Sequence, residues 1–265
     1  MLPPYSIILA PNPSIMTGPG TNTIVLGSAE TGSTIIDPGD DDPSHLDAIV
    51  QAGQEHGGIS RILITHGHSD HIGGAAALRE RLGVPILAFN RLGVPIADEE
   101  IADGTTFSVG DDTLRAVHTP GHRFDHLCYL LEKRRILFAG DVIAGVGTVV
   151  IIPPEGDMLE YLNTLTRLQG MDIAEMVPAH GPNVTDPPAK LAEYIAHRLQ
   201  REQQVLDALR ALPHGATIPA LVEHIYIDVD PRLHKPAAWS VEAHLLKLER
   251  EGRVKRVEQD GWELH

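Results

Sequence analysis

The sequence predicts an α/β layered fold followed by a smaller domain of helices and one hairpin. Up to about residue 185, short apolar runs alternate with turns rich in Gly, Pro and Asp. Helical patterns fall between some of these runs, which favours layers of sheet and helix over an all-β sandwich. After Pro187 the pattern becomes mainly helical. A chain of 265 residues is long enough for one large domain and a small one.

Apolar runs bounded by turn residues are expected to be strands. Eight such runs occur, at Thr23–Gly27, Thr34–Asp37, Arg61–Thr65, Pro85–Phe89, Thr106–Val109, Leu114–Thr119, His126–Leu131 and Arg135–Ala139. Apolar residues at helical spacing predict helices over Pro43–His56, Ile72–Leu82 and Tyr161–Gln169.

The C-terminal part is expected to form a connecting helix and a winged-helix-like domain. We place the larger domain at 1–186, the connecting helix at 187–213 and the small domain at 214–265. Within the small domain we expect a short helix, a longer helix with Ser240 as its N-cap and Gly252 as its end, and a hairpin. These elements are predicted at Thr217–Tyr226, Ser240–Gly252, Arg253–Glu258 and Trp262–Leu264, with the hairpin turn at Gln259-Asp260-Gly261.

Composition limits the functional classes. The formal net charge is −15, which disfavours tight nonspecific binding to nucleic acids. Cys128 is the single cysteine, so no disulfide framework forms within one chain. The N-terminal residues lack the basic and apolar stretches of a signal peptide, and no long apolar run occurs. We therefore expect a cytoplasmic protein without a membrane partner.

A dense group of metal-ligand residues follows a predicted strand. Thr65-His66-Gly67-His68-Ser69-Asp70-His71 places four potential ligands within six residues, on a loop between a strand and a helix. Three more candidates end apolar runs beside glycines, namely His122, Asp141 and His180. Each zinc ion takes about four ligands. The seven residues together therefore predict a site for two metal ions.

These segments, in this order, resemble the metallo-β-lactamase superfamily over residues 15–185, and Thr34-Ile35-Ile36-Asp37-Pro38-Gly39 resembles its first motif. The resemblance implies a four-layer αββα sandwich with the metals at one edge of its sheets. It also implies a first metal on His66, His68 and His122 and a second on Asp70, His71 and His180, bridged by Asp141.

Four nearby residues are expected to play other roles. We expect Asp37 to orient ligands through hydrogen bonds rather than to bind metal. His126 is expected to support the ligands or the structure, His118 to belong to a strand, and Cys128 to pack in the core.

The metals define the predicted chemistry, which is that of a hydrolase. Two zinc ions would acidify a bridging water to hydroxide and polarise a carbonyl or phosphoryl oxygen of the substrate. Iron or manganese could replace zinc on His and Asp ligands. Asp70 and Asp141 are the expected catalytic residues, as partners for the hydrogen of the hydroxide. The acid that protonates the leaving group is not evident from the sequence.

A closer resemblance, over nearly the whole chain, is to the beta-lactamase-like protein 2 subfamily. It rests on stretches such as Gly20-Thr21-Asn22-Thr23, Gly145-Val146-Gly147-Thr148 and Tyr194-Ile195-Ala196-His197-Arg198. This resemblance implies endoribonuclease cleavage of single-stranded RNA, the function that we expect first. The alternative is hydrolysis of a small acyl ester or thioester, as in glyoxalase II or acyl-carrier thioesterases. The loop after the third motif reads Arg123-Phe124-Asp125, where Thr-x-Asp is more usual. The resemblance therefore does not determine the substrate preference near this loop.

The C-terminal domain has two possible roles. Its residues 213–265 contain seven Lys and Arg against nine Asp and Glu, whereas a DNA-reading winged helix is usually basic. A basic cluster nevertheless occurs at Lys247, Arg250, Arg253, Lys255 and Arg256. The domain is therefore expected either to cover the pocket or to contact a nucleic-acid strand. A transcription regulator is disfavoured because the metal ligands would have no purpose. The sequence fixes no oligomeric state.

Overall fold

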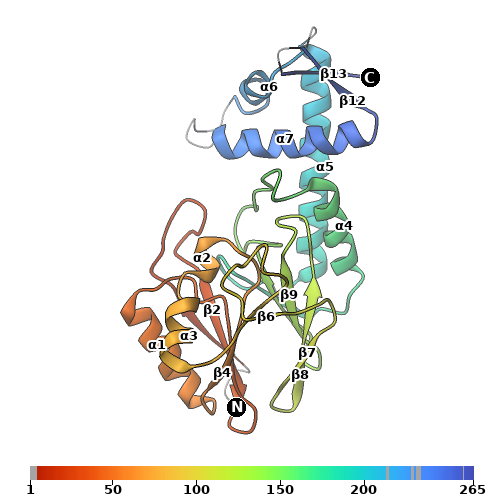
Figure 1. The fold of residues 1–265 in the computed structure, drawn as a ribbon. Coiled ribbons are helices and arrows are strands. Elements are labelled where there is room, and N and C mark those ends of the chain that lie inside the picture. The colour runs from red at the N-terminus through yellow and green to blue at the C-terminus, as the bar shows by residue number, and fades with distance from the viewer. Residues whose placement is uncertain (1–4, 213–214, 228–229, 231–233, 259) are drawn as a thin grey trace. The chain divides into compact units, whose positions relative to one another are not determined.

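The computed structural model describes residues 5–212, 215–227, 230, 234–258 and 260–265, and it divides into two compact units (Figure 1). The first unit contains Met1–Thr119, Asp125–Thr148 and Met171–Pro187. The second contains Pro120–Phe124, Val149–Gly170 and Pro188–His265. Pro213, the predicted end of the connecting helix, and Gln259, in the predicted hairpin turn, lie outside the described residues.

The first unit begins with a mixed sheet whose strands follow chain order. Its strands are β1 (Tyr5–Leu9), β2 (Asn22–Ser28), β3 (Gly32–Ile36), β4 (Ile59–Leu63), β5 (Ile86–Ala88) and β6 (Glu99–Glu100). Strands β1 to β3 are antiparallel, and β3 to β6 are parallel. The parallel part arises because helices connect β3 to β4 and β4 to β5.

The second sheet of this unit has the order β11-β10-β9-β8-β7. Its strands are β7 (Thr106–Val109), β8 (Asp112–His118), β9 (Leu127–Leu131), β10 (Ile136–Gly140) and β11 (Glu175–Pro178). All five residues of β9 are buried, as expected for the central strand of a covered sheet. Strands β10 and β11 are parallel, so their carboxyl ends lie at the same edge.

Alternation along the strands of the first sheet creates two apolar layers. Ile24, Ile36 and Leu63 belong to the same core as Leu114, Tyr129 and Phe138 of the second sheet. The intervening residues Val25, Ile35 and Ile62 instead share a core with Leu46 and Ile49 of α1 (Pro43–Glu55) and Leu78 of α3 (Ala75–Leu82). Strand residues with a period of two thus separate the layers. This unit itself provides three layers: helices, first sheet and second sheet.

The helix predicted at Ile72–Leu82 ends as expected but begins three residues later, as α3 at Ala75. The chain forms α2 (Ser69–Ile72) and α3 (Ala75–Leu82), interrupted at Gly73 and Gly74. The N–H of Gly74 donates to the carbonyl of Pro38 at 2.7 Å instead of continuing the helical ladder. The short α2 can therefore belong to the loop that carries Asp70 and His71.

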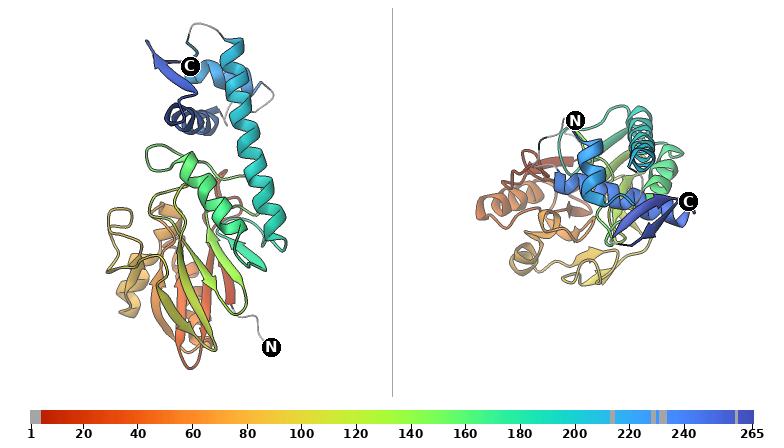
Figure 2. Two further views of the ribbon diagram at one scale, coloured as in Figure 1. Left: turned by 90° about the vertical axis from the view of Figure 1, so that its right-hand side faces the viewer. Right: turned by 90° about the horizontal axis from the view of Figure 1, so that it is seen from above.

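The second unit contains the winged-helix elements. These are α4 (Met158–Gln169), α5 (Pro187–Ala211), α6 (Ile218–Ile225), α7 (His234–Arg250), β12 (Val254–Val257) and β13 (Gly261–Leu264). Figure 2 shows α6, α7 and the β12–β13 hairpin around the C-terminal half of α5. Val205 and Leu209 of α5 pack with Leu221, Leu245 and Trp262 in one core.

The predicted N-cap at Ser240 was wrong, because α7 already begins at His234. Pro236 lies in the first turn of this helix. A proline there breaks no helical hydrogen bond, because the first N–H groups of a helix have no intrahelical acceptor. The proline therefore permits a helix that starts six residues before Ser240.

No helix among the described residues is long and apolar enough to cross a membrane.

Candidate metal centre

The strands of the first unit end at the residues that the sequence singled out. Asp37 follows β3, the His66 loop follows β4, Asp141 follows β10, and His180 lies two residues after β11. Carboxyl ends of parallel strands meet at one edge of a sheet, and β3–β4 and β10–β11 are both parallel pairs. The topology thereby gathers side chains from distant parts of the sequence.

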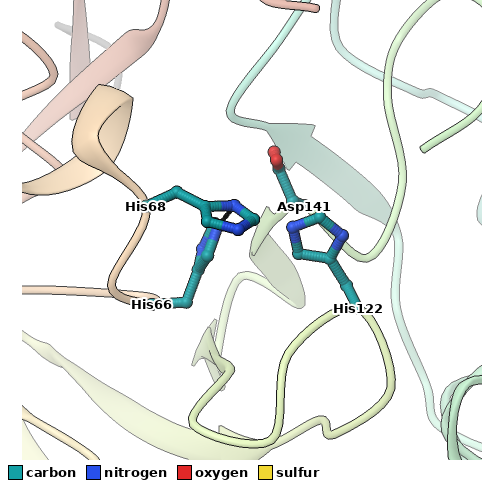
Figure 3. A group of neighbouring side chains, drawn as sticks. All are labelled: His66, His68, His122 and Asp141. Carbon is teal, nitrogen blue, oxygen red and sulfur yellow. Dashed lines mark hydrogen bonds between the residues drawn. The ribbon is translucent and has the colours of Figure 1, made fainter. Parts of the chain in front are cut away.

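His66, His68, His122 and Asp141 form the first group of possible ligands. Each offers one ligand atom, and these atoms all lie within 4.8 Å of one another. Figure 3 shows the three imidazole rings gathered near the carboxylate of Asp141. The Nε2 of His66 lies 2.8 Å from the Nδ1 of His68, so these two nitrogen atoms face each other.

Asp70, His71 and His180 form the second group, again with ligand atoms within 4.8 Å of one another. The Nε2 of His180 lies 3.3 Å from Oδ2 of Asp70. The two oxygens of Asp141 extend to this group as well, at 3.4 Å from His180 and 3.5 Å from His71. Asp141 therefore lies against both groups.

The outward nitrogen of several rings is held by an oxygen acceptor. The Nδ1 of His71 donates to Oδ2 of Asp37 at 2.7 Å, and the Nδ1 of His122 donates to the carbonyl of Val150 at 2.9 Å. The Nδ1 of His180 donates more weakly to the carbonyl of Gly20, at 3.4 Å. In each case Nε2 is left for a ligand, which is how metal-binding histidines are commonly oriented.

One atom gives a direct test of whether a metal ion fits. The Nε2 of His71 is buried and makes no hydrogen bond, although Oδ2 of Asp141 lies 3.5 Å away. A buried ring nitrogen is rarely left without a partner in a folded protein. An ion in the second group would satisfy it, and imidazole with carboxylate is a donor set that suits zinc, iron or manganese. The residues present therefore fit a metal ion.

Asp37 makes several contacts but belongs to neither group. Besides His71, its carboxylate accepts from the N–H of Thr65 at 2.8 Å and from the Thr65 hydroxyl at 2.6 Å. With these three bonds the carboxylate fixes the start of the His66 loop and the ring of His71. This arrangement agrees with the orienting role expected for Asp37.

His126 supports Asp141 through the backbone. Its Nε2 accepts the N–H of Asp141 at 3.0 Å, and its Nδ1 lies 2.8 Å from the hydroxyl of Thr119. Gly140, just before Asp141, has φ +50, and a Cβ there would lie 2.6 Å from the His126 ring. Only glycine accommodates both that backbone angle and that contact.

His118 and Cys128 lie where the sequence analysis expected them. His118 ends β8, and its ring stacks on Phe89 with centroids 3.9 Å apart. Cys128 is buried in β9, where its Sγ contacts the hydroxyl of Thr119 and the carbonyl of Ala139. Neither residue belongs to a ligand group.

Sequence reasoning assigned no role to three residues that hold the ligand loops. The hydroxyl of Thr65 contacts Asp37 and the His66 and His71 rings. Asp125 accepts the N–H of Gly67 at 2.9 Å, and Thr21 donates to the carbonyl of Asp70 at 2.8 Å. All three lie in segments that the motifs had already marked, which was the available signal.

The charges of the second group stabilise one another. Burial lowers the pKa of His71, but Asp141 and Asp37 raise it more, and the net result lies well above its usual value. Burial raises the pKa of Asp70, but the hydrogen bond with His180 and the charge of His71 lower it overall. Asp70 thus stays ionised, and the carboxylates around His71 favour its protonated form. Both shifts indicate a negative potential at this point, which favours the binding of a divalent cation.

Comparison with known proteins identifies the family. The model of the metallo-beta-lactamase superfamily matches residues 16–180. The model of the beta-lactamase associated winged helix domain matches residues 217–262. The chain therefore belongs to the metallo-β-lactamase superfamily, and it combines the mixed α/β fold of that family with a C-terminal winged helix. The superfamily consists generally of metal-dependent hydrolases, and this chain is an enzyme of that class.

Two curated relatives match along most of the chain. The Beta-lactamase-like protein 2 homolog of Drosophila melanogaster is 35% identical over 94% of this chain and 88% of its own. The Atrochrysone carboxyl ACP thioesterase of Aspergillus chevalieri is 35% identical over 93% of this chain and 81% of its own. The resemblance to the beta-lactamase-like protein 2 subfamily is thereby confirmed.

A solved structure supports the fold over the full length. The metallo-beta-lactamase family protein from Thermus thermophilus matches with a TM-score of 0.81 at 21% identity. The match covers 100% of this chain and 99% of that chain. At this identity the comparison describes the fold alone.

Proposed function

We propose that this protein hydrolyses an acyl thioester, using two metal ions held by the two ligand groups. His66, His68 and His122 would hold the first ion and Asp70, His71 and His180 the second, with Asp141 facing both. Zinc is the proposed metal, and iron or manganese would suit the same donors. When bound, two such ions lower the pKa of a water molecule toward neutrality and stabilise negative charge on the substrate oxygen.

The observation behind the acyl substrate is a set of exposed apolar side chains on loops tied to the ligands. Leu92 is 94% exposed, Val146 is 75% exposed and Ile15 is 70% exposed. Such exposure of large apolar side chains commonly marks a binding surface when several lie around one site.

Each of these loops is attached to a ligand-bearing segment. The N–H of Gly145, beside Val146, donates to the carbonyl of His180 at 2.8 Å. The loop of Ile15 is joined through Asn12 to Thr21, whose hydroxyl donates to the carbonyl of Asp70. Next to Leu92, a Cβ on Gly93 would lie 2.2 Å from the carboxylate of Asp125, which accepts the N–H of Gly67. These loops thus offer apolar surface beside the ligands, which suits an acyl chain.

RNA cleavage, the function expected first from the resemblance and the two-metal site, would also use the basic cluster of the winged helix. Each of its five cations has a carboxylate partner within the second unit. The pairs are Lys247–Glu202, Arg250–Asp157, Arg253–Glu202, Lys255–Glu263 and Arg256–Glu249. A phosphate would have to displace a carboxylate at each position. This competition makes RNA the second candidate.

The chain's own groups suggest how the reaction proceeds. Asp70 has the more exposed of the two carboxylates, at 26% against 12% for Asp141, and its low pKa keeps it ionised. We assign it to accept the proton of the attacking water. The oxygen of that water bonds to the thioester carbon, the C–S bond breaks, and the products are a carboxylic acid and a thiol.

A thioester also suits a site without an assigned acid. The imidazoles and carboxylates of the two groups are all proposed as ligands or as the proton acceptor. An ordinary thiol has a pKa of about 8.5 and leaves readily as thiolate, whereas the alkoxide of a phosphodiester requires protonation. Thioester cleavage therefore needs no further residue to protonate the leaving group.

A substrate panel tests the proposal. Purified protein would be offered acyl thioesters of increasing chain length and a labelled unstructured RNA, each with and without chelator. We expect chelator-sensitive thioester turnover that rises with chain length. Asp70→Ala is the control for contaminating activity, because it should abolish turnover of any true substrate.

A pair of variants tests the apolar loops. Leu92→Ser and Val146→Ser should raise KM for long acyl thioesters several-fold and leave short ones nearly unchanged. RNA cleavage without thioester turnover in the wild type would contradict the proposal and favour the second candidate.

A further inference from the structure

The outward nitrogen of His122 is held by a main-chain carbonyl, as that of His180 is, whereas the outward nitrogen of His71 is held by the carboxylate of Asp37. The acceptor for its Nδ1 is the carbonyl of Val150, at 2.9 Å. A main-chain carbonyl moves with its segment, so it can orient a ring only if other groups hold that segment in place. The position of His122 therefore depends on the groups that hold residues 149 and 150.

The side chain of Arg198 holds this segment. Arg198 lies on α5, and it is only 2% exposed. Its Nη2 donates to the carbonyl of Val149 at 2.6 Å, one peptide before the acceptor of His122. Burying a guanidinium costs free energy of folding unless the group is hydrogen-bonded or paired with a charge. The bond to Val149 therefore contributes to holding Arg198 in its buried position.

Arg198 also contacts α4, the helix against which the turn before His122 packs. Its guanidinium carbon is 5.2 Å from the centre of the Tyr161 ring of α4, in a cation–π arrangement. The backbone of Tyr161 in turn touches the residue before His122. Gly121 has φ +135, and a Cβ there would lie 2.4 Å from the N of Tyr161.

Helix α4 and its N-cap fix this turn through two further bonds. The hydroxyl of Thr164 donates to the carbonyl of Pro120 at 2.7 Å. The N–H of Asp157, the N-cap of α4, donates to the carbonyl of Gly121 at 2.8 Å. His122 is therefore held on its main-chain side by α4 and on its ring side by Val150. Arg198 contacts α4 at Tyr161 and the second segment at Val149, the residue before Val150.

We propose that Arg198 is a positioning residue for His122, which orients the ring by fixing the 149–150 segment against α4. The planar guanidinium can donate to a carbonyl and face an aromatic ring at the same time, which a lysine ammonium cannot do with the same geometry. This inference depends on the two-ion centre but not on which substrate is cleaved.

The test uses the full-length protein with Arg198→Met and Arg198→Lys. Arg201→Met is the matched control, because Arg201 lies on the same helix and faces the Tyr226 ring at 4.7 Å instead. Zinc affinities would be measured by competition with a chromophoric chelator. We expect Arg198→Met to weaken one of the two binding steps by roughly 10–100-fold, the range typical when a group that orients a ligand is lost. Arg198→Lys should recover part of this loss, and Arg201→Met should bind both ions as the wild type does.

A spectroscopic readout distinguishes positioning from a general loss of structure. Ring ¹H–¹⁵N spectra of the metal-free protein, labelled at histidine, report each imidazole separately. Arg198→Met should shift the His122 signals and leave those of His71 and His180 unchanged. Unchanged affinities at both steps, or equal losses accompanied by shifts in all ligand rings, would overturn the inference. If Arg198→Met is unfolded by circular dichroism, the same two outcomes are read from Arg198→Lys.

Discussion

The Nδ1 of His71 donates to Oδ2 of Asp37 across 2.7 Å, with both side chains buried. A candidate ligand ring is thus hydrogen-bonded to a carboxylate that is not itself a ligand candidate. Through Thr65 the same carboxylate also holds the loop of His66. One residue therefore influences both ligand groups.

Loss of Asp37 should weaken metal binding without removing a ligand. Asp37→Ala leaves the His71 ring without its acceptor, and we expect zinc affinity to fall by roughly 10–100-fold. The measurement is competition with a chelator. Asp41→Ala, an exposed carboxylate in the same loop, is the control and should bind zinc normally. An experimental structure with Asp37 bonded directly to metal would refute the orienting role.

Two ions per chain are expected from the two groups. Elemental analysis after zinc loading should give close to two equivalents for the wild type and fewer for Asp141→Ala. The variant should also lose activity, because Asp141 lies against His71, His180 and the first group. A wild type that never exceeds one ion would contradict the bridging role predicted for Asp141.

Salt dependence should separate the two candidate substrates. RNA binding through several phosphate contacts weakens steeply as salt rises, whereas a neutral acyl substrate is nearly indifferent to salt. We expect thioester turnover to change little between low and moderate salt. It should also change little in the triple variant Arg253→Ala, Lys255→Ala, Arg256→Ala. Steep salt dependence, together with loss of activity in that variant, would indicate RNA.

His244 should make the second unit sensitive to acid. This residue is buried on α7, and burial, followed by nearby positive charge, lowers its pKa to about 3. Glu202 lies 4.0 Å from its Nδ1. The cations that lower the pKa are Arg198, Lys247, His197 and Arg201.

The sign of this effect follows from proton uptake. Below a pH of about 6.5 the unfolded chain binds a proton at His244 and the folded chain does not, so stability is lost as the pH falls toward 3. Between pH 6.5 and 5 the loss should be about 2 kcal/mol. Denaturant unfolding of chelator-treated protein should show it in the wild type but not in His244→Met. His224→Met removes an exposed histidine and should keep the wild-type slope. Parallel slopes for the wild type and His244→Met would disprove it.

Much of the fold follows from local patterns in the sequence. The strands before Asp37 and Asp141 are apolar runs that end at an aspartate beside turn residues, and such runs are visible without any structure. Strands β1, β6 and β11 were not predicted. The two residues of β6 form a strand only because β5 pairs with them, and that pairing is not encoded locally.

The candidate site divides in the same way. Side chains with metal-binding chemistry are recognisable by residue type, and the structure brings all seven into two groups. Their assignment as ligands stays a prediction. The carbonyls of Val150 and Gly20 have no signature in the sequence, because every residue has a carbonyl. Arg198 was part of a recognised stretch, but only the tertiary structure gives it the Val149 contact.

The burial of Cys128 has a practical consequence. Its thiol lies in the central strand of the second sheet and is 0% exposed, between Thr119 and Ala139. A thiol-specific alkylating reagent can reach it only when that sheet opens. Because it is the single cysteine of the chain, the rate of labelling in native buffer measures one event, the local opening of the second sheet around β9. The rate of Cys128 labelling thus reports local unfolding of the native protein, and no engineered probe is required.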